Sequence, residues 1–178
     1  MTLLIAHRGL VDGPDRDKEN TLSAILSARS RGYDVEIDLW YHDNTWWLGH
    51  DKPQYKIDVD WLQLIDRQDY LDEHHAWIHA KTIQTLYQLR KIRWQGHVFF
   101  HENDPTVLTS SGYLWTFPGQ ELTALSVCVM PENTDAILRC CELNVYAFCS
   151  DWICRIEQDL LSCSGKPGRF SPWMDSCV

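Results

Sequence analysis

The chain alternates short, continuously apolar runs with longer stretches in which apolar residues recur every three or four positions. Runs of the first kind predict buried β-strands, and stretches of the second kind predict amphipathic helices. The predicted strands cover residues 3–7, 33–40, 76–81, 97–102, 112–117, 125–130 and 145–150. The predicted helices cover residues 21–32, 59–65, 83–96, 133–143 and 152–161, and residues 43–51 form a turn with a short extra strand. Asn20 is the expected N-cap of the first helix, which ends at Gly32.

Strands that alternate with helices along a chain usually pair in parallel through right-handed crossovers. The pattern therefore predicts an α/β fold with about seven parallel strands. A (β/α)8 barrel typically needs about 250 residues, whereas this chain has 178. We therefore expect a compact or incomplete (β/α)8 TIM-type barrel in which loops replace several crossover helices, with an open doubly wound sheet as the alternative. One domain is expected over residues 1–178, in which residues 163–178 form a polar C-terminal tail.

Charge and composition narrow the classes of partner. The formal net charge of −9, without any run of Lys or Arg, argues against binding to nucleic acid or to an anionic membrane surface. No apolar segment approaches the roughly 20 residues that span a bilayer, so no stable membrane insertion is expected. We expect a cytoplasmic protein that acts on a small molecule. The seven cysteines include no Cys-x-x-Cys pair, which predicts free thiols rather than a zinc site.

Polar residues gather at the carboxyl ends of the first three predicted strands. They are His7 and Arg8, then Glu36 and Asp38, then His79 and Lys81. The carboxyl ends of parallel strands open on one face of the fold, so these side chains are expected to converge on one pocket. Residues two apart in a strand share a side, which places Glu36 beside Asp38.

Two neighbouring carboxylates on a buried strand repel each other and lose hydration, so they need a positive partner. Oxygen ligands of this kind suit Mg²⁺ or Ca²⁺. The alternative is a buried salt-bridge network in which Arg8 and Lys81 neutralise Glu36 and Asp38 without a metal. The nearby histidines favour the metal site.

Four motifs in this region resemble the signature of the glycerophosphodiester phosphodiesterases, which belong to the phosphatidylinositol-specific phospholipase C-like barrel superfamily. They are HRG at residues 7–9, ENT at 19–21, EID at 36–38 and GHD at 49–51. The match follows the family's order and spacing over roughly the first 80 residues. The later half, through FFHEND, LTSSGYLWTFPG and VMPE, is similar to a short bacterial subgroup of that family.

The resemblance implies a role for each matching residue. It assigns general acid and base chemistry to His7 and His50. It assigns the divalent cation to Glu36 and Asp38, and phosphate contact to Arg8. 

The same resemblance implies that Lys81 steadies negative charge and that Glu19 and Asn20 support the site from the start of the first helix.

The chain departs from the family at the third strand, where the family usually has Glu-x-Lys and this chain has His79-Ala80-Lys81. His79 can bind a divalent cation through a neutral ring nitrogen, and it shifts the preference from calcium toward magnesium, manganese or zinc. The missing oxygen ligand can instead come from a residue near a later strand end. Those candidates are Glu102, Asp104, Glu132 and Asp151. The expected cofactor is therefore Mg²⁺ or Ca²⁺, with Mn²⁺ as a further option.

His101 and Trp115 complete the expected pocket lining. We expect a metal-dependent phosphodiesterase that cleaves a small glycerophosphodiester-like or glycan-linked phosphodiester by acid/base catalysis from two histidines. Two alternatives are a lyase that releases a cyclic phosphate and a non-catalytic module that binds a phosphorylated glycan.

Overall fold

The structure is a computed structural model that describes residues 2–66, 74–131 and 133–164. Its strands are β1 (Leu3–Ala6), β2 (Asp34–His42), β3 (Thr45–Leu48), β4 (Tyr55–Ile57), β5 (Ala76–Ala80), β6 (His97–Phe99), β7 (Thr106–Leu108), β8 (Leu114–Thr116), β9 (Ser126–Val129) and β10 (Ala147–Ser150). Its helices are the 3-10 turn η1 (His7–Gly9) and the α-helices α1 (Leu22–Ser30), α2 (Val59–Asp66), α3 (Ile83–Lys91), α4 (Thr134–Glu142) and α5 (Ile153–Ser164). The expected tail falls largely on residues 165–178, outside the described residues.

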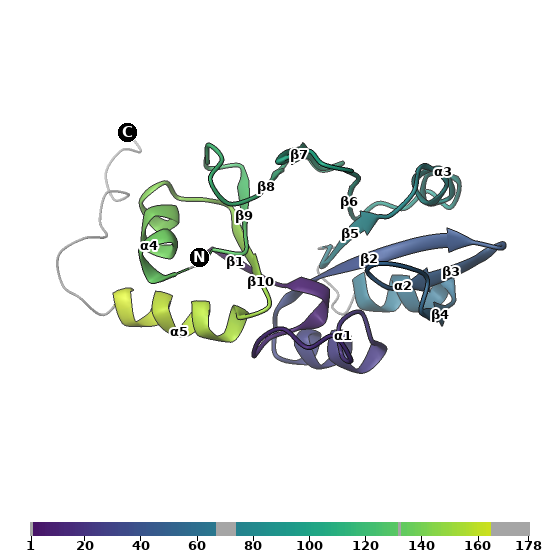
Figure 1. Cartoon of the computed structure of the whole chain (residues 1–178), viewed down its shortest axis with the longest axis horizontal. Coiled ribbons are helices and arrows are strands. Elements are labelled where there is room, and N and C mark those ends of the chain that lie inside the picture. Colours follow the sequence, from purple (N-terminus) through teal and green to yellow (C-terminus); the bar gives the residue numbers. More distant parts are fainter. Residues whose placement is uncertain (1, 67–73, 132, 165–178) are drawn as a thin grey trace, which may run out of the picture.

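The strands form one curved, mixed sheet (Figure 1). Parallel ladders join β6, β5, β2, β1, β10, β9 and β8 in that spatial order. Antiparallel ladders add β3 and β4 beside β2, and β7 beside β8. The result is a half-barrel, because within the described ranges no ladder joins β6 to β7 or β8.

The predicted (β/α)8 barrel, compact or incomplete, is therefore wrong. The sheet contains antiparallel pairs, and helices do not follow every strand. The connections between β6 and β9 cover only residues 100–105, 109–113 and 117–125. A crossover with its helix needs at least about 10–12 residues, so these segments form loops and the short antiparallel pair β7–β8 instead.

The two faces of the sheet differ in what covers them. Buried apolar residues from all five described α-helices belong to one core cluster with Val35, Ile37 and Leu39 of β2. The opposite, inner face carries a second cluster that includes Trp77 and Trp115. Helices thus cover one face, which also excludes the doubly wound alternative. The alternation along β2 turns Glu36 and Asp38 toward the inner face.

The first helix begins one residue later than expected. The Thr21 side chain is the N-cap and accepts a hydrogen bond from the Ala24 N–H at 3.2 Å. Asn20 instead has a left-handed backbone, with φ 58°, and is fully buried. This conformation directs its amide into the sheet, where it contacts β2.

A hairpin returns the chain from β2 to the site. Asp43 and Asn44 have φ of 48° and 55°, the left-handed pair that closes a tight turn between antiparallel strands. Gly49, just after β3, donates its N–H to the Asp38 carbonyl at 3.2 Å. The Trp40 indole donates to the Gly49 carbonyl at 2.6 Å. These two bonds fix the backbone immediately before His50.

Across the described ranges, no helix is both long enough and apolar enough to pass through a bilayer.

Candidate functional site

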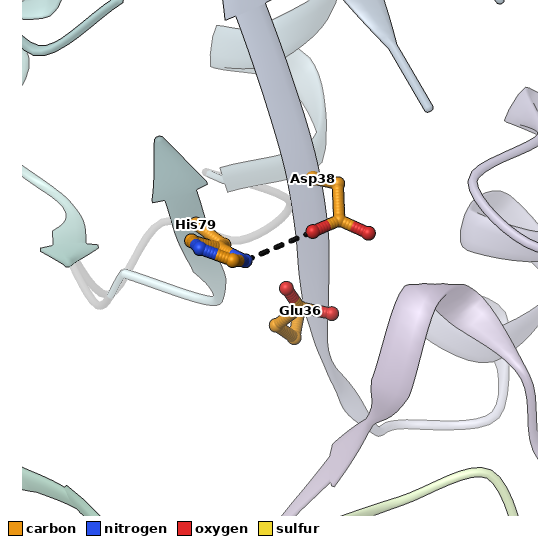
Figure 2. Close-up of side chains that lie close together, drawn as sticks. All are labelled: Glu36, Asp38 and His79. Atoms are coloured by element: carbon orange, nitrogen blue, oxygen red, sulfur yellow. Dashed lines mark hydrogen bonds and ion pairs between the residues drawn. The ribbon is translucent and has the colours of Figure 1, made fainter. Parts of the chain in front are cut away.

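Three potential metal ligands meet on the inner face of the sheet. Glu36 and Asp38 come from β2, and His79 comes from β5, where it is paired with Asp38 in the ladder. Each offers one ligand atom, and these atoms lie within 4.8 Å of one another. Figure 2 shows the three side chains turned toward a common point. Glu36 and Asp38 are 2% and 1% exposed, so a cation bound there would be largely removed from water.

Asp38 is surrounded by positive and hydrogen-bonding groups. Its Oδ1 lies 2.9 Å from Nδ1 of His79 and 3.1 Å from Nζ of Lys81. Its Oδ2 lies 3.1 Å from Nδ1 of His50 and accepts a 3.0 Å bond from the Asn20 amide. Burial opposes ionisation, but the hydrogen bonds from His50 and His79 and the charge of Lys81 hold the pKa of Asp38 well below its usual range.

Glu36 has the opposite electrostatic environment. It accepts a hydrogen bond from the Arg8 backbone N–H at 3.1 Å. Burial, and then the negative charge of Asp38, raise its pKa above the ordinary value. A cation placed beside Glu36 would favour its ionised form, so the electrostatics of the pair are compatible with a divalent metal.

His7 forms a dyad with Asp151. The turn η1 follows β1, and Asp151 follows the neighbouring strand β10, so the parallel pairing of β1 with β10 brings the two together. His7 Nδ1 lies 2.7 Å from Asp151 Oδ1. Because a carboxylate only accepts, Nδ1 carries the proton, and Nε2 faces Glu36 Oε2 at 3.9 Å. Burial lowers the pKa of His7, but the Asp151 bond and the Glu36 charge outweigh it and raise that pKa overall.

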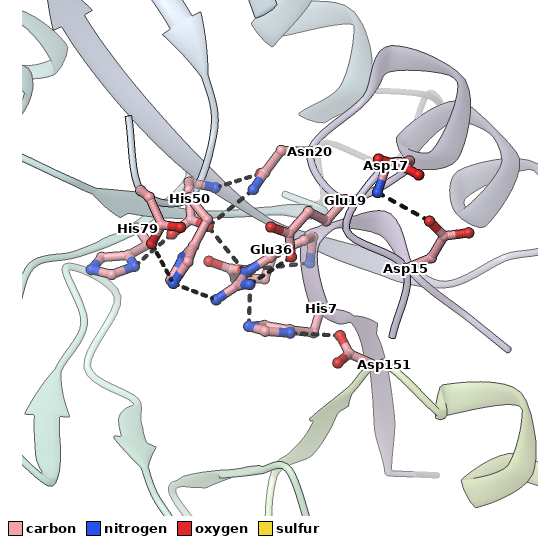
Figure 3. Close-up of polar contacts among 12 residues, drawn as sticks. His7, Asp15, Asp17, Glu19, Asn20, Glu36, His50, His79 and Asp151 are labelled. Carbon is pink, nitrogen blue, oxygen red and sulfur yellow. Dashed lines mark hydrogen bonds and ion pairs between the residues drawn. The ribbon is translucent and has the colours of Figure 1, made fainter. Parts of the chain in front are cut away.

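The Arg8 guanidinium contacts Glu19, His50 and Asp38. Figure 3 shows His7, Glu36 and His50 within one network of polar contacts. Arg8 NH1 donates to Glu19 at 2.7 Å, and its NH2 lies 3.2 Å from Nε2 of His50. Its Nε lies 3.1 Å from Asp38 Oδ2, in an ion pair that lacks the direction of a hydrogen bond. Burial works against the charge, but Asp38 and Glu36 raise the pKa of Arg8, so the guanidinium stays positive at the centre of the site.

Asn20 connects the start of the first helix to β2. Its Oδ1 accepts the Asp38 backbone N–H at 2.9 Å, while its Nδ2 donates to the Asp38 carboxylate. Its own N–H donates to the Arg8 carbonyl at 2.9 Å. Asn20 therefore fixes Asp38 against η1, and Glu19 beside it fixes the Arg8 guanidinium.

The structure gathers His7, Arg8, Glu19, Asn20, Glu36, His50, His79 and Lys81 around Asp38, together with Asp151. Where the structure describes them, the suggested substitute ligands lie outside the group of Glu36, Asp38 and His79 ligand atoms. Glu102 and Asp104 are exposed, and Glu132 lies outside the described residues. Asp151, another candidate ligand, is occupied by His7.

His101 and Trp115 have different surroundings from each other. The His101 ring stacks on His79, with centroids 4.6 Å apart, and its Nδ1 is buried without a hydrogen-bond partner. Burial, and then the charges of His79 and Lys81, lower its pKa. Trp115 is 2% exposed and packs on Phe99 in the inner core, so it does not line an open pocket.

Both interpretations of the acidic pair find support in the contacts. Arg8 and Lys81 form ion pairs with Asp38, as the salt-bridge alternative predicts. Two carboxylates and an imidazole also form a donor set that suits a divalent cation. Sequence reasoning did not single out Trp40, and it suggested Asp151 as a metal ligand, whereas in the structure Asp151 contacts His7. The position of Asp151 directly after the last predicted strand was the signal that placed it at the site.

Comparison with protein-family models found no match, and a search of curated proteins found no significant relative, so the family resemblance remains a prediction from the four motifs.

Proposed function

We propose that this protein is a metal-dependent phosphodiesterase that cleaves a small glycerophosphodiester-like or glycan-linked phosphodiester. The observation that supports this proposal is the meeting of two oriented imidazoles, one guanidinium and an acidic cation-binding cluster in a single network. A buried salt-bridge network alone does not require two histidines, each held by its own carboxylate.

Glu36, Asp38 and His79 would hold the divalent cation. The bound metal would supply positive charge that neutralises non-bridging phosphate oxygens and favours attack at phosphorus. Arg8 and Lys81 are the protein's own cations at this point and would bind the same phosphate. With the metal, Arg8 and Lys81 would place three positive charges near one phosphate, and the nearby carboxylates would balance that charge before substrate binds.

His7 and His50 divide the proton transfers. Asp151 holds His7 and favours its protonated form, so His7 suits the role of general acid toward the leaving oxygen. His50 donates a hydrogen bond from Nδ1 to Asp38, so its Nε2 carries a lone pair that faces Arg8 NH2. Once the phosphate engages Arg8, that lone pair can accept a proton from the attacking hydroxyl or water. Each positioned group contributes about 10²- to 10⁴-fold.

Hydrolysis of bis-p-nitrophenyl phosphate and of a glycerophosphodiester panel, with Mg²⁺, Mn²⁺ or Ca²⁺, tests this proposal. We expect turnover that chelator abolishes and that His7→Ala and Asp38→Ala each lower by about 10² or more. Turnover that survives both substitutions contradicts the mechanism. Phosphorus NMR of the product separates hydrolysis from release of a cyclic phosphate. Binding without turnover of any substrate would favour the phosphoglycan-binding module.

A further inference from the structure

Two thiols meet on the helix-covered face of the sheet, away from the phosphodiester site. Cys128 lies on β9 and Cys140 lies on α4, and both belong to the core between sheet and helices. They are 7% and 2% exposed. Their Sγ atoms are 3.1 Å apart, so the side chains point at each other across the contact between β9 and α4.

This contact is more specific than the packing of two small apolar side chains. Buried cysteines ordinarily behave as small hydrophobes that contact carbon atoms. Here the two sulfurs lie within hydrogen-bonding distance of each other. A disulfide bond has a length of about 2.05 Å, so the two sulfurs lie about 1 Å beyond bonding distance.

The two thiols differ in their surroundings. The sulfur contact with Cys128 and the charge of Arg139 lower the pKa of Cys140 against the effect of burial. The same sulfur contact, together with burial, raises the pKa of Cys128. Since the thiolate is the reactive form of cysteine, we take Cys140 as the attacking sulfur and Cys128 as the resolving one; the cross-link itself requires only the 3.1 Å contact between them.

We propose that Cys128 and Cys140 form an oxidisable dithiol that hydrogen peroxide converts into an intramolecular disulfide. The Cys140 thiolate attacks one peroxide oxygen, the O–O bond breaks, and the products are a Cys140 sulfenic acid and hydroxide, which takes up the thiol proton as water. The Cys128 sulfur then attacks the Cys140 sulfur, the S–O bond breaks, and a second water leaves with the Cys128 proton. The two thiols lose two electrons, and the peroxide gains them.

The cross-link would join α4 covalently to the sheet. Cys128 is paired with Phe148 of β10 in the parallel ladder, and β10 leads directly to Asp151. Oxidation therefore stabilises the packing behind the strand that carries the His7 partner. It depends on neither a bound metal nor phosphodiester cleavage, so it can be tested separately from the proposed function.

Peptide mapping of the oxidised full-length chain tests the proposal. The reduced protein is treated with hydrogen peroxide, its remaining thiols are alkylated in denaturant, and it is digested without reduction. We expect a linked pair of peptides that contain Cys128 and Cys140, which dithiothreitol separates, and a melting temperature several degrees higher after oxidation. Recovery of both cysteines in alkylated form, or their linkage only to other cysteines, would overturn the proposal.

Variants make the test specific. Cys149→Ala removes a buried thiol on the opposite face of the sheet and should leave the cross-link intact. Cys140→Ala should abolish both the cross-link and the rise in melting temperature. Cys128→Ala should stop the reaction at the Cys140 sulfenic acid, which dimedone traps. Circular dichroism confirms folding of each variant, and the mapping of the unsubstituted chain decides the outcome where a variant does not fold.

Discussion

His7 Nδ1 lies 2.7 Å from Asp151 Oδ1, although the two residues are 144 positions apart in the chain. The parallel pairing of the first strand with the last one creates this contact, which closes the site from the C-terminal side. Asp151 selects the ring tautomer of His7 and, with Glu36, favours its protonated form. The orientation of His7, the proposed general acid, therefore depends on the pairing of β1 with β10.

Asp151→Asn should lower the pKa of His7, because the asparagine oxygen can still accept the Nδ1 hydrogen bond but carries no negative charge, which leaves burial opposed mainly by the charge of Glu36. If His7 is the general acid, activity falls as pH rises through its pKa, so the alkaline limb of the pH–rate profile should move to lower pH. We expect kcat to fall by about 10² or more at pH 7. NMR titration of the His7 ring measures the same shift without an assay.

Asp135→Asn, an exposed change in the first turn of α4, is the matched control and should alter neither measurement. An unchanged His7 titration in Asp151→Asn would exclude the dyad as the cause of the raised pKa.

His79→Glu should change the cation preference of the site. A third carboxylate replaces the imidazole, and hard oxygen ligands favour Ca²⁺ and Mg²⁺ over Mn²⁺ or Zn²⁺. We expect Ca²⁺ affinity to rise by about tenfold, equivalent to about 1.4 kcal/mol, in isothermal titration calorimetry. His79→Gln, which lacks both the imidazole and the added charge, should weaken binding of every cation. Equal Ca²⁺ affinity in all three proteins would count against residue 79 as a ligand.

The site was more predictable from the sequence than the fold. His7 follows β1 and His79 lies near the end of β5, and the parallel pairing of both strands with β2 brings these residues beside Glu36 and Asp38. Their convergence therefore survives the loss of the complete barrel. The local alternation along β2 is enough to turn Glu36 and Asp38 to the same side.

Local sequence patterns could not show that the sheet remains a half-barrel and contains antiparallel pairs. The segments around β7 and β8 are short, and an apolar run of three residues does not reveal whether its partner is parallel or antiparallel. Asn20 was expected as a helix cap because its residue type suits that position, but its left-handed backbone serves Asp38 instead. The conformation of Asn20 depends on its contact with Asp38, 18 residues away, and the spacing of residue types along the chain does not reveal such a contact.

The ionised form of Asp38 should stabilise the fold above acidic pH. Its pKa in the folded state lies well below the ordinary value of 3.8, so the unfolded chain binds its proton at a higher pH than the folded chain does. Stability from this group is therefore present above about pH 4 and is lost as pH falls through the folded-state pKa.

Asp38→Asn should lower the free energy of unfolding at pH 7 by roughly 3–5 kcal/mol, because it leaves Arg8 and Lys81 without their buried partner. Urea denaturation at several pH values measures the difference from the unsubstituted protein, which should shrink only at the acidic end. A difference that stays constant down to pH 3 would show that the Asp38 charge is not its source.

Gly49→Ala should displace His50 more than it disturbs the rest of the fold. Gly49 has φ +148°, and an added Cβ would lie 2.2 Å from the Lys52 carbonyl oxygen, which belongs to the backbone and cannot simply rotate away. The loop must move, and the bonds that Gly49 makes with Trp40 and Asp38 weaken with it. We expect kcat to fall by about tenfold or more, and stability to fall by about 1–3 kcal/mol.

Gly32→Ala provides the matched comparison, since Gly32 also has a positive φ of 87° but an added Cβ there meets nothing within 4 Å. Gly32→Ala should lower the free energy of unfolding by about 1 kcal/mol through backbone strain alone and should leave kcat unchanged. Trp40→Phe separates the two effects at the loop, because it removes the 2.6 Å bond to the Gly49 carbonyl without adding an atom beside Lys52. A loss of activity in Trp40→Phe and Gly49→Ala, but not in Gly32→Ala, would show that turnover depends on the position of His50. Equal losses of activity in all three variants would instead indicate general destabilisation.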